Sequence, residues 1–401
     1  MQRGRLATLA WFRPGAPDPA DPLDDTSGLI AELRNDYRID IFTGTSAHDF
    51  VWRHFRNPFD LCVFELDNTA AHAFVWPYLL RYPGVLLLRA VTLHDSRAAA
   101  LVHARRFAHY ADEFRFSERR PAPVADAKRS APRGTWPMLR IPFTAARAVV
   151  VPNQGTATVL QDMYPEARLR YAPQAIAGPP ANAPSGTPAP ADSRPVTFGA
   201  LASNATETLR QAVSRAQEGG AAATLLLADS AGQLLREADV VLALSWPSSA
   251  TSDPLPLAAM AAGRPVVMFE TGPTAEWPAL NPQTWLPRGF GPAAPVAVSL
   301  DVRDAEHSLM LSVRRLARDR TLRASLGAAG MAWWRAHATA PHAAAAWGAV
   351  LREAATLAPR PRPDGWPAHL DADGTDHAAA VLREFGTSVD FLQPARELPD
   401  V

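Results

Sequence analysis

Short apolar runs alternate with longer amphipathic segments along the first 176 residues. The apolar runs have the length of strands and occupy residues 6–12, 38–44, 59–66, 84–91, 148–153 and 167–176. Segments with apolar residues three and four positions apart, which predict helices, occupy residues 26–37, 71–83, 96–114 and 155–164. Because most of the strand-like runs are continuously apolar, we expect a parallel, doubly wound sheet that is covered on both faces.

The same alternation begins again after residue 194. Strand-like runs at 195–201, 222–229, 239–246 and 264–271 alternate with helix-like segments at 205–220, 231–238 and 253–263. The stretch from Asp304 to about Leu357 has a helical pattern almost throughout. The predicted fold class is therefore α/β, with two doubly wound, Rossmann-like domains that face a cleft.

A segment rich in proline, alanine, glycine and serine separates the two halves, which is typical of a linker. We therefore divide the chain into an N-terminal domain (1–176), a linker (177–194), a C-terminal domain (195–330), helices that cross back (331–357) and a tail (358–401). The tail has one further helical stretch, residues 376–386.

Composition narrows the class of protein. The 401 residues are 47% apolar, and 40 basic residues balance 40 acidic ones, so no overall charge attracts nucleic acid. Cys62 is the single cysteine, which rules out a disulfide within the chain and suits a cytoplasmic location. No apolar stretch approaches the ~20 residues of a membrane span, so we expect at most peripheral membrane contact.

Several common sites have no support in the sequence. Lys128 is the only lysine and lies in a loop-like segment without a phosphate-binding glycine pattern, which excludes a P-loop and argues against pyridoxal chemistry. His94, His103 and His109 are nine and six positions apart, so they do not stack on one helix face as metal ligands do. We expect neither a metal nor a cofactor.

Three segments resemble bacterial glycosyltransferases of the GT-B fold, in the large retaining group often called family four. They are "AAHAFVWPYLLRYPGVLLL", "VVVPNQGTATVLQDMYPEARLRYAPQAI" and "ADVVLALSWPSSATSDPLPLAAMAAGRPVVMFETGPTAEWP". The last is the most specific, because "AMAAGRPVV", a polar strand end and "AEWP" follow one another in the family's order. The resemblance covers most of residues 1–357 and includes a C-terminal helix that crosses back.

The resemblance implies a substrate class. Such enzymes bind a nucleotide-sugar donor mainly in the C-terminal half and a glycan or small-molecule acceptor in the N-terminal half. The departing diphosphate gathers negative charge, which helix N-termini and cations stabilise, and carboxylates hold the sugar hydroxyls. The implied reaction transfers a sugar with retention, by front-side attack that the donor's own phosphate assists.

The chain departs from the family at four places. The family's two glutamates, eight positions apart, fall on Ala250 and Ala258, and its Arg and Lys pair is missing from the stretch 203–206. An "HD" pair is replaced by Arg89 and Ala90, and the N-terminal glycine-rich loop keeps only Gly15. These departures leave two hypotheses: an active glycosyltransferase, or a catalytically degenerate relative that binds a sugar or acts as a partner subunit of an active enzyme.

The remaining polar residues give the candidate site. Expected catalytic residues are His94 and Asp95; donor-binding residues are Arg89, Thr251, Ser252, Asp253 and Glu270; acceptor-side residues are Asn68, His72 and Gly15. Several have a structural alternative: Asp253 before Pro254 is also an ordinary helix cap, and Asn68, His94 and Asp95 can cap helices as well. His72 can instead be a surface histidine beside such a cap. Trp246 either stacks on a ring of the ligand or packs in the core.

Overall fold

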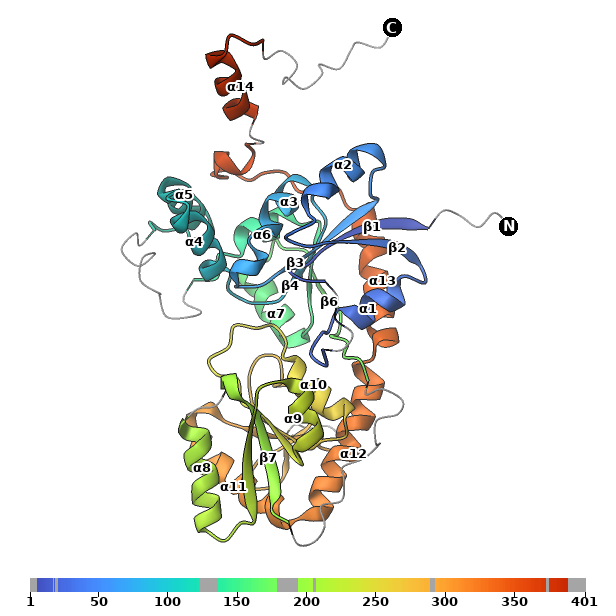
Figure 1. Ribbon diagram of the computed structural model, residues 1–401, viewed down its shortest axis with the longest axis vertical. Coiled ribbons are helices and arrows are strands. Elements are labelled where there is room, and N and C mark those ends of the chain that lie inside the picture. The colour runs from blue at the N-terminus through green and yellow to red at the C-terminus, as the bar shows by residue number, and fades with distance from the viewer. Residues whose placement is uncertain are drawn as a thin grey trace, which may run out of the picture.

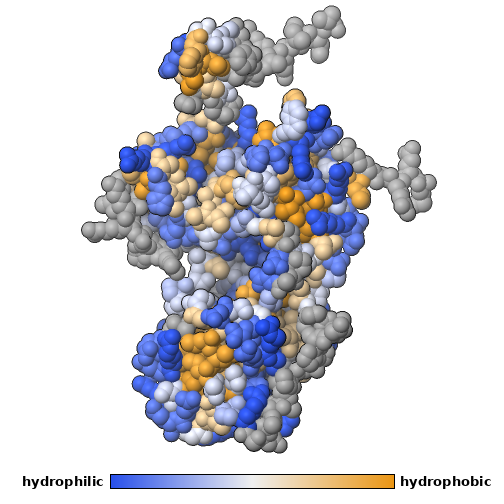
Figure 2. Space-filling model, viewed as in Figure 1, coloured by the Kyte–Doolittle hydropathy of each residue, from blue (hydrophilic) through white to orange (hydrophobic). Residues whose placement is uncertain are grey.

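Two parallel sheets, each flanked by helices, form the molecule, and they lie end to end with a narrow waist between them (Figures 1 and 2). The computed structural model describes residues 6–16, 18, 21–122, 136–178, 194–204, 207–288, 293–372 and 375–388. Lys128 and residues 179–193 of the predicted linker lie outside these residues. The predicted α/β class with two doubly wound domains is confirmed.

The N-terminal sheet has six parallel strands in the order β2-β1-β3-β4-β5-β6. Their bounds are β1 Ala7–Phe12, β2 Tyr37–Phe42, β3 Leu61–Leu66, β4 Val85–Leu88, β5 Ala148–Val151 and β6 Leu169–Tyr171. The helices around them are α1 Ser27–Leu33, α2 His48–Arg56, α3 Val75–Arg81, α4 His94–His103, α5 Phe107–Glu118, α6 Arg140–Ala145 and α7 Gln154–Met163. All six residues of the central strand β3 are buried, including Glu65, as its mainly apolar run predicts.

The C-terminal sheet has seven strands in the order β12-β11-β13-β10-β9-β7-β8. All neighbours are parallel except β11 and β12. The strands are β7 Val196–Leu201, β8 Ala223–Ala228, β9 Val240–Ala243, β10 Val266–Phe269, β11 Ala279–Leu280, β12 Pro287–Arg288 and β13 Ala297–Leu300. The helices are α8 Glu207–Glu218, α9 Ala231–Glu237, α10 Pro254–Ala261, α11 Ala305–Arg318 and α12 Arg320–His337.

The chain returns to the first domain through α13, Ala340–Thr356. Trp347 of this helix is buried against Trp11 of β1, with ring centroids 5.3 Å apart, and Arg170 of β6 forms an ion pair with Glu353. Beyond α13, Trp366 packs against the N-terminal core and His369 Nε2 lies 2.8 Å from Glu113 Oε1. Helix α14, Thr375–Glu384, follows near the end of the described chain.

Some elements differ from the expectation. The helix predicted over 96–114 is two helices, α4 and α5, because Arg105 between them has a positive φ of 56° that ends the first. The sequence pattern also missed α2 and the short strands β11, β12 and β13. Helix α2 is rich in aromatic and charged residues and buries only Phe50, so it has no wide apolar stripe.

Candidate functional site

The two domains meet through a short antiparallel pairing of main chains. Ala90, just after β4, forms a β-bridge with Ala250 in the β9–α10 loop. The Val91 amide donates to the Ser249 carbonyl at 2.7 Å, and the Thr251 amide donates to the Arg89 carbonyl at 2.9 Å. We call this pairing of 89–91 with 249–251 the interdomain seam; it fixes one wall of the space between the domains.

A cavity of about 140 Å³ lies beside the seam. Val91 and Thr156 line it from the N-terminal domain. The C-terminal domain supplies the other lining residues from two loops, the one after β9 and the one after β10: Ser245, Trp246, Ser248, Ala250, Ser252, Asp253, Thr271, Gly272 and Pro273. We call it the donor-side cavity.

Two further cavities continue the same space. One of about 440 Å³ shares Val91, Thr156 and Gly272 with the donor-side cavity and extends along α7. The other, about 460 Å³, shares Ala275 and Glu276 with the second and lies against the C-terminal sheet. The lining loops follow β4, β5, β9 and β10, so this interdomain cleft lies at carboxyl ends of strands in both sheets, where doubly wound folds bind ligands.

Asp253, the residue before helix α10, lines the donor-side cavity. The Asp253 carboxylate accepts a hydrogen bond from the Leu255 amide at 3.0 Å and thereby caps the helix, with Pro254 at the first helical position. Burial raises the pKa of Asp253 to about 6. The carboxyl group therefore exchanges a proton close to neutral pH while it faces the cavity.

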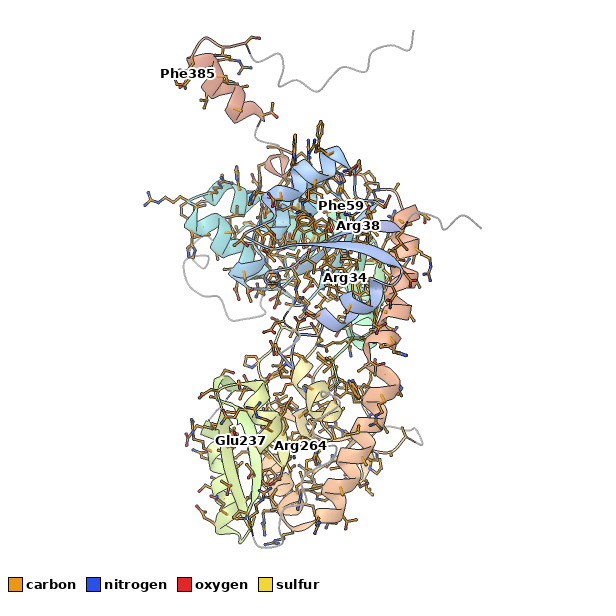
Figure 3. The ribbon with its side chains drawn as sticks, turned by 45° about the vertical axis from the view of Figure 1, so that its right-hand side comes forward. Arg34, Arg38, Phe59, Glu237, Arg264 and Phe385 are labelled. Carbon is orange, nitrogen blue, oxygen red and sulfur yellow. The ribbon has the colours of Figure 1, made fainter. Side chains whose placement is uncertain are left out.

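Packing explains why α10 is so apolar. Every residue from Leu255 to Ala261 is buried, between the C-terminal sheet on one side and α12 with the chain around Ile176 on the other. Arg264, which follows the helix, donates to the carbonyls of Leu235 and Arg236 and holds the end of α9 beside it (Figure 3). Ala258 lies inside this packing, so a glutamate side chain there would be buried among apolar groups.

The other donor-side candidates have different surroundings. Ser252 lines the donor-side cavity, whereas Thr251 is fully buried and its hydroxyl donates to the Leu88 carbonyl at 2.7 Å across the seam. Glu270 lines the third cavity, where it forms an ion pair with Arg288. Trp246 is 54% exposed at the rim of the donor-side cavity, so the core-packing alternative is wrong for this residue.

Arg89 points into the N-terminal domain. Its guanidinium forms an ion pair with Asp25 at 2.6 Å, and Gln174 donates to the same carboxylate oxygen at 2.6 Å. Glu65 is fully buried beside them and accepts a hydrogen bond from Trp11 Nε1 at 2.7 Å. Burial would lower the pKa of Arg89, but Asp25 and Glu65 raise it above its usual value; burial raises the pKa of Glu65.

His94, Asp95 and Asn68 form a second polar cluster. His94 is buried, with Nε2 2.9 Å from the Tyr110 hydroxyl and Nδ1 3.2 Å from Asp95 Oδ1. Asn68 Nδ2 donates to Asp95 Oδ2 at 3.0 Å and to the Thr92 hydroxyl at 3.2 Å. Thr92 lines the second cavity, so Asn68 reaches the wall of the cleft through its hydrogen bond to the Thr92 hydroxyl.

The last two acceptor-side candidates, His72 and Gly15, do not line any of the three cavities. His72 is buried with Nδ1 2.9 Å from the Thr69 hydroxyl, and burial lowers its pKa to about 4, so it is neutral at pH 7. Gly15 is exposed in the loop after β1, with no atom near the position of a Cβ. Sequence reasoning missed Thr156, which lines the cleft together with Glu276. The Asn153 cap at the start of α7, which also donates to the Pro273 carbonyl, is the signal that marks this edge.

Two negative findings apply to the described part of the chain. Its His, Cys, Asp and Glu side chains form no group of three or more that could hold a metal ion. None of its helices is long and apolar enough to cross a bilayer.

Two facing parallel α/β domains, with a final long helix that returns to the first, define the GT-B class of glycosyltransferase folds. The crystal structure of Anabaena Alr3699/HepE in complex with UDP-glucose has this fold: its TM-score is 0.50 at 11% identity, over 86% of this chain and 99% of that one. WaaG, a glycosyltransferase involved in lipopolysaccharide biosynthesis, gives a TM-score of 0.46 at 11% identity, over 84% and 98% of the two chains. No family model and no curated protein matches the sequence.

Proposed function

We propose that this protein is a glycosyltransferase that uses a nucleotide-sugar donor. The observation that carries the proposal is the position of the interdomain cleft. It lies between carboxyl ends of strands from two parallel sheets, and the C-terminal domain lines it with hydroxyls, three carboxyl groups, an arginine and an exposed indole. Such a lining suits a ligand that carries rings, hydroxyls and phosphates.

In this proposal the ring, the hydroxyl groups and the diphosphate of the donor each contact a different side chain of the cleft. The Trp246 ring, exposed at the rim, stacks against the base or the sugar ring. Ser252 and Thr271 bind hydroxyl or phosphate oxygens, and Asp253 accepts from a sugar hydroxyl. Arg288, the one arginine, lysine or histidine among the described residues that line the three cavities, faces the departing diphosphate, and its ion pair with Glu270 holds it in place.

The chemical step follows the retaining course that the resemblance implies. The bond between the anomeric carbon and the donor phosphate breaks, the acceptor oxygen bonds to the same face of that carbon, and the acceptor proton passes to the departing diphosphate. The cluster of Asn68, Asp95 and Thr92 at the N-terminal wall orients the acceptor, a glycan or a small molecule.

One observation favours a second function, that of a non-catalytic relative that binds a sugar or acts as a partner subunit of an active glycosyltransferase. Among the described residues that line the donor-side cavity, none is Arg, Lys or His. A diphosphate there would have only uncharged donors, namely hydroxyls, main-chain amides and the Trp246 indole N–H. Charge-assisted hydrogen bonds are about twice as strong as neutral ones. Ligand binding without turnover would identify this second function.

Nucleotide release by the purified chain tests the proposal. The protein is incubated with UDP- and GDP-sugars, with and without glycan acceptors, and the free nucleoside diphosphate is separated by chromatography. Trp246→Ala should lower kcat/KM about ten-fold, since ring stacking contributes about 1 kcal/mol or more. Phe385→Ala, which also removes an exposed aromatic ring (79% exposed, just after α14), is the matched control and should have no effect. If Trp246→Ala releases the nucleoside diphosphate as fast as the wild type, the donor does not bind at this site.

A further inference from the structure

Helix α2 presents aromatic side chains to solvent. Trp52 is 61% and Phe55 is 79% exposed, and their rings stack at 6.2 Å. Val51 on the same helix and Leu6 before β1 are also exposed, while Phe50 alone anchors the helix in the core. These four side chains are among the most exposed large apolar groups of the described chain, and an exposed apolar cluster of this kind marks an interaction surface.

A groove of about 710 Å³ adjoins the aromatic pair. Its charged lining consists of three arginines, Arg38, Arg53 and Arg56, and one carboxylate, Asp40. Arg53 lies 3.5 Å from Asp40, and the Arg56 guanidinium lies over the Trp52 ring at 5.1 Å. Within the described residues neither Arg38 nor Arg56 forms an ion pair. Figure 3 shows Arg38 and Phe59, another lining residue, on the same part of the N-terminal domain.

This combination matches the surface of an anionic bilayer. Tryptophan and phenylalanine on a short helix settle at the boundary between headgroups and acyl chains, and neighbouring arginines bind lipid phosphates through paired N–H donors. A second copy of the chain fits less well, because a two-fold contact through this face would bring the same three arginines together. The positive charge of this face therefore favours a negatively charged partner surface.

We propose that the α2 face, formed by Leu6, Arg38, Val51, Trp52, Arg53, Phe55 and Arg56, docks the protein on an anionic membrane surface. The rings enter the headgroup boundary and the guanidiniums bind lipid phosphates. The α2 face lies on the N-terminal domain away from the C-terminal domain (Figure 1), so docking leaves the interdomain cleft uncovered. The proposal concerns binding alone and stands whether or not the cleft is catalytic.

Vesicle sedimentation with the full chain tests the docking. The vesicles consist of phosphatidylcholine alone or of phosphatidylcholine with phosphatidylglycerol. We expect the protein to partition onto the anionic vesicles, more weakly as salt rises, and to leave neutral vesicles largely unbound. Replacing Arg38, Arg53 and Arg56 together by glutamine should lower the partition coefficient about a hundred-fold. Trp52→Ser with Phe55→Ser should lower it at least about ten-fold.

Matched variants separate this face from general charge and hydrophobicity. Arg210, Arg335 and Arg352 are exposed arginines elsewhere on the chain, and Phe385 is as exposed as Phe55. Their replacement by glutamine and serine, respectively, should leave partition unchanged. Equal loss in the control variants, or a wild-type protein that ignores anionic vesicles, would overturn the proposal. A dimer in solution that the Trp52→Ser, Phe55→Ser variant dissociates would show a protein contact instead.

A site-specific label gives a second readout. Cys62 is buried, so a polarity-sensitive dye on Asn57→Cys, next to the exposed rings, reports on this face alone. Anionic vesicles should shift its emission to the blue, and the same dye on Thr158→Cys of α7 should not respond. Blue shifts at both positions, or at neither, would contradict docking through the α2 face.

Discussion

Asp253 combines two roles at the scale of a single residue. It caps α10 and it also faces the donor-side cavity, where burial raises the pKa of its carboxyl group to about 6 from the usual 3.8. Burying this carboxylate costs free energy, and an uncharged residue such as asparagine would cap the helix equally well. The aspartate therefore marks a position with a role other than helix capping. Its titration provides a direct test.

Asp253→Asn should change how stability depends on pH. The folded pKa lies above the unfolded one, so the stabilising contribution of the protonated form is present below about pH 4 and is lost as pH rises through 6. Asparagine keeps the cap but does not titrate. Relative to wild type, the variant should gain about 2 kcal/mol of unfolding free energy between pH 4 and pH 7. Denaturant unfolding at both pH values measures this gain. A stability difference between variant and wild type that does not change with pH would contradict the raised pKa of Asp253.

Helix α10 shows, at the scale of an element, how packing limits chemistry. The two alanines at the family's glutamate positions are not equivalent, because Ala258 is buried against Ile176 and Ala338 while Ala250 is half-buried at the cavity wall. Apolar packing therefore closes position 258, whereas position 250 faces the donor-side cavity.

Glutamate substitutions should separate these positions. Ala258→Glu should cost about 3 kcal/mol or more, because it buries a carboxylate without a partner. Ala250→Glu should cost less than about 1 kcal/mol, since its side chain can reach the cavity. Thermal and denaturant unfolding of both variants provide the comparison, and equal costs would mean that α10 packs differently.

A buried carboxylate, Glu113, is one of the groups that hold the segment after α13 on the N-terminal domain. Glu113 accepts bonds from Arg97 Nε and Nη2 at 2.5 Å each, and His369 Nε2 lies 2.8 Å from it. Burial would raise the pKa of Glu113, but the bonds from His369 and Arg97 lower it below its usual value. The stabilisation is therefore present above the unfolded pKa and lost as pH falls through the folded one.

Glu113→Gln should cost about 3 kcal/mol at pH 7, because the buried Arg97 guanidinium loses its counter-charge. The variant should also lose less stability than wild type on acidification to pH 3. Thermal unfolding at the two pH values checks the energy, and limited proteolysis checks whether residues 358–372 are cut faster. Unchanged proteolysis would show that other contacts hold this segment.

Sequence reasoning succeeded where a single chain segment determines its own structure. The apolar runs became the parallel strands, and the Asp253-Pro254 start and Gly263 stop of α10 appear as predicted. It failed to predict the ion pair of Arg89 with Asp25, whose carboxylate also accepts from Gln174, the break at Arg105, and the exposure of Trp246. Local patterns predict which face of an element is buried, but not which charged side chain meets another across the fold.

At the scale of the whole molecule, the interdomain seam joins the two domains beside the cleft. Hydrogen bonds between the main chain of 89–91 and that of 249–251, together with the Thr251 hydroxyl, hold the domains together beside the cleft. A donor larger than the 140 Å³ donor-side cavity must use the neighbouring cavities or open the seam.

Thr251→Val should loosen the seam without altering the shape of the side chain. The lost bond to the Leu88 carbonyl should lower stability by about 1 kcal/mol and speed hydrogen exchange at the Val91 amide. Thr158→Val, which removes a hydroxyl bond within α7, is the matched control and should leave exchange at Val91 unchanged. If Val91 exchanges equally in both variants, the hydroxyl does not hold the domains.

Isothermal titration of the full chain with UDP, GDP and their sugar conjugates tests the central claim, that the interdomain cleft binds a nucleotide-sugar donor. The account predicts micromolar binding to one nucleotide, about ten-fold weaker in Trp246→Ala and unchanged in Phe385→Ala. The absence of heat with every nucleotide and nucleotide sugar at millimolar concentration would contradict the donor site and direct the search to protein partners.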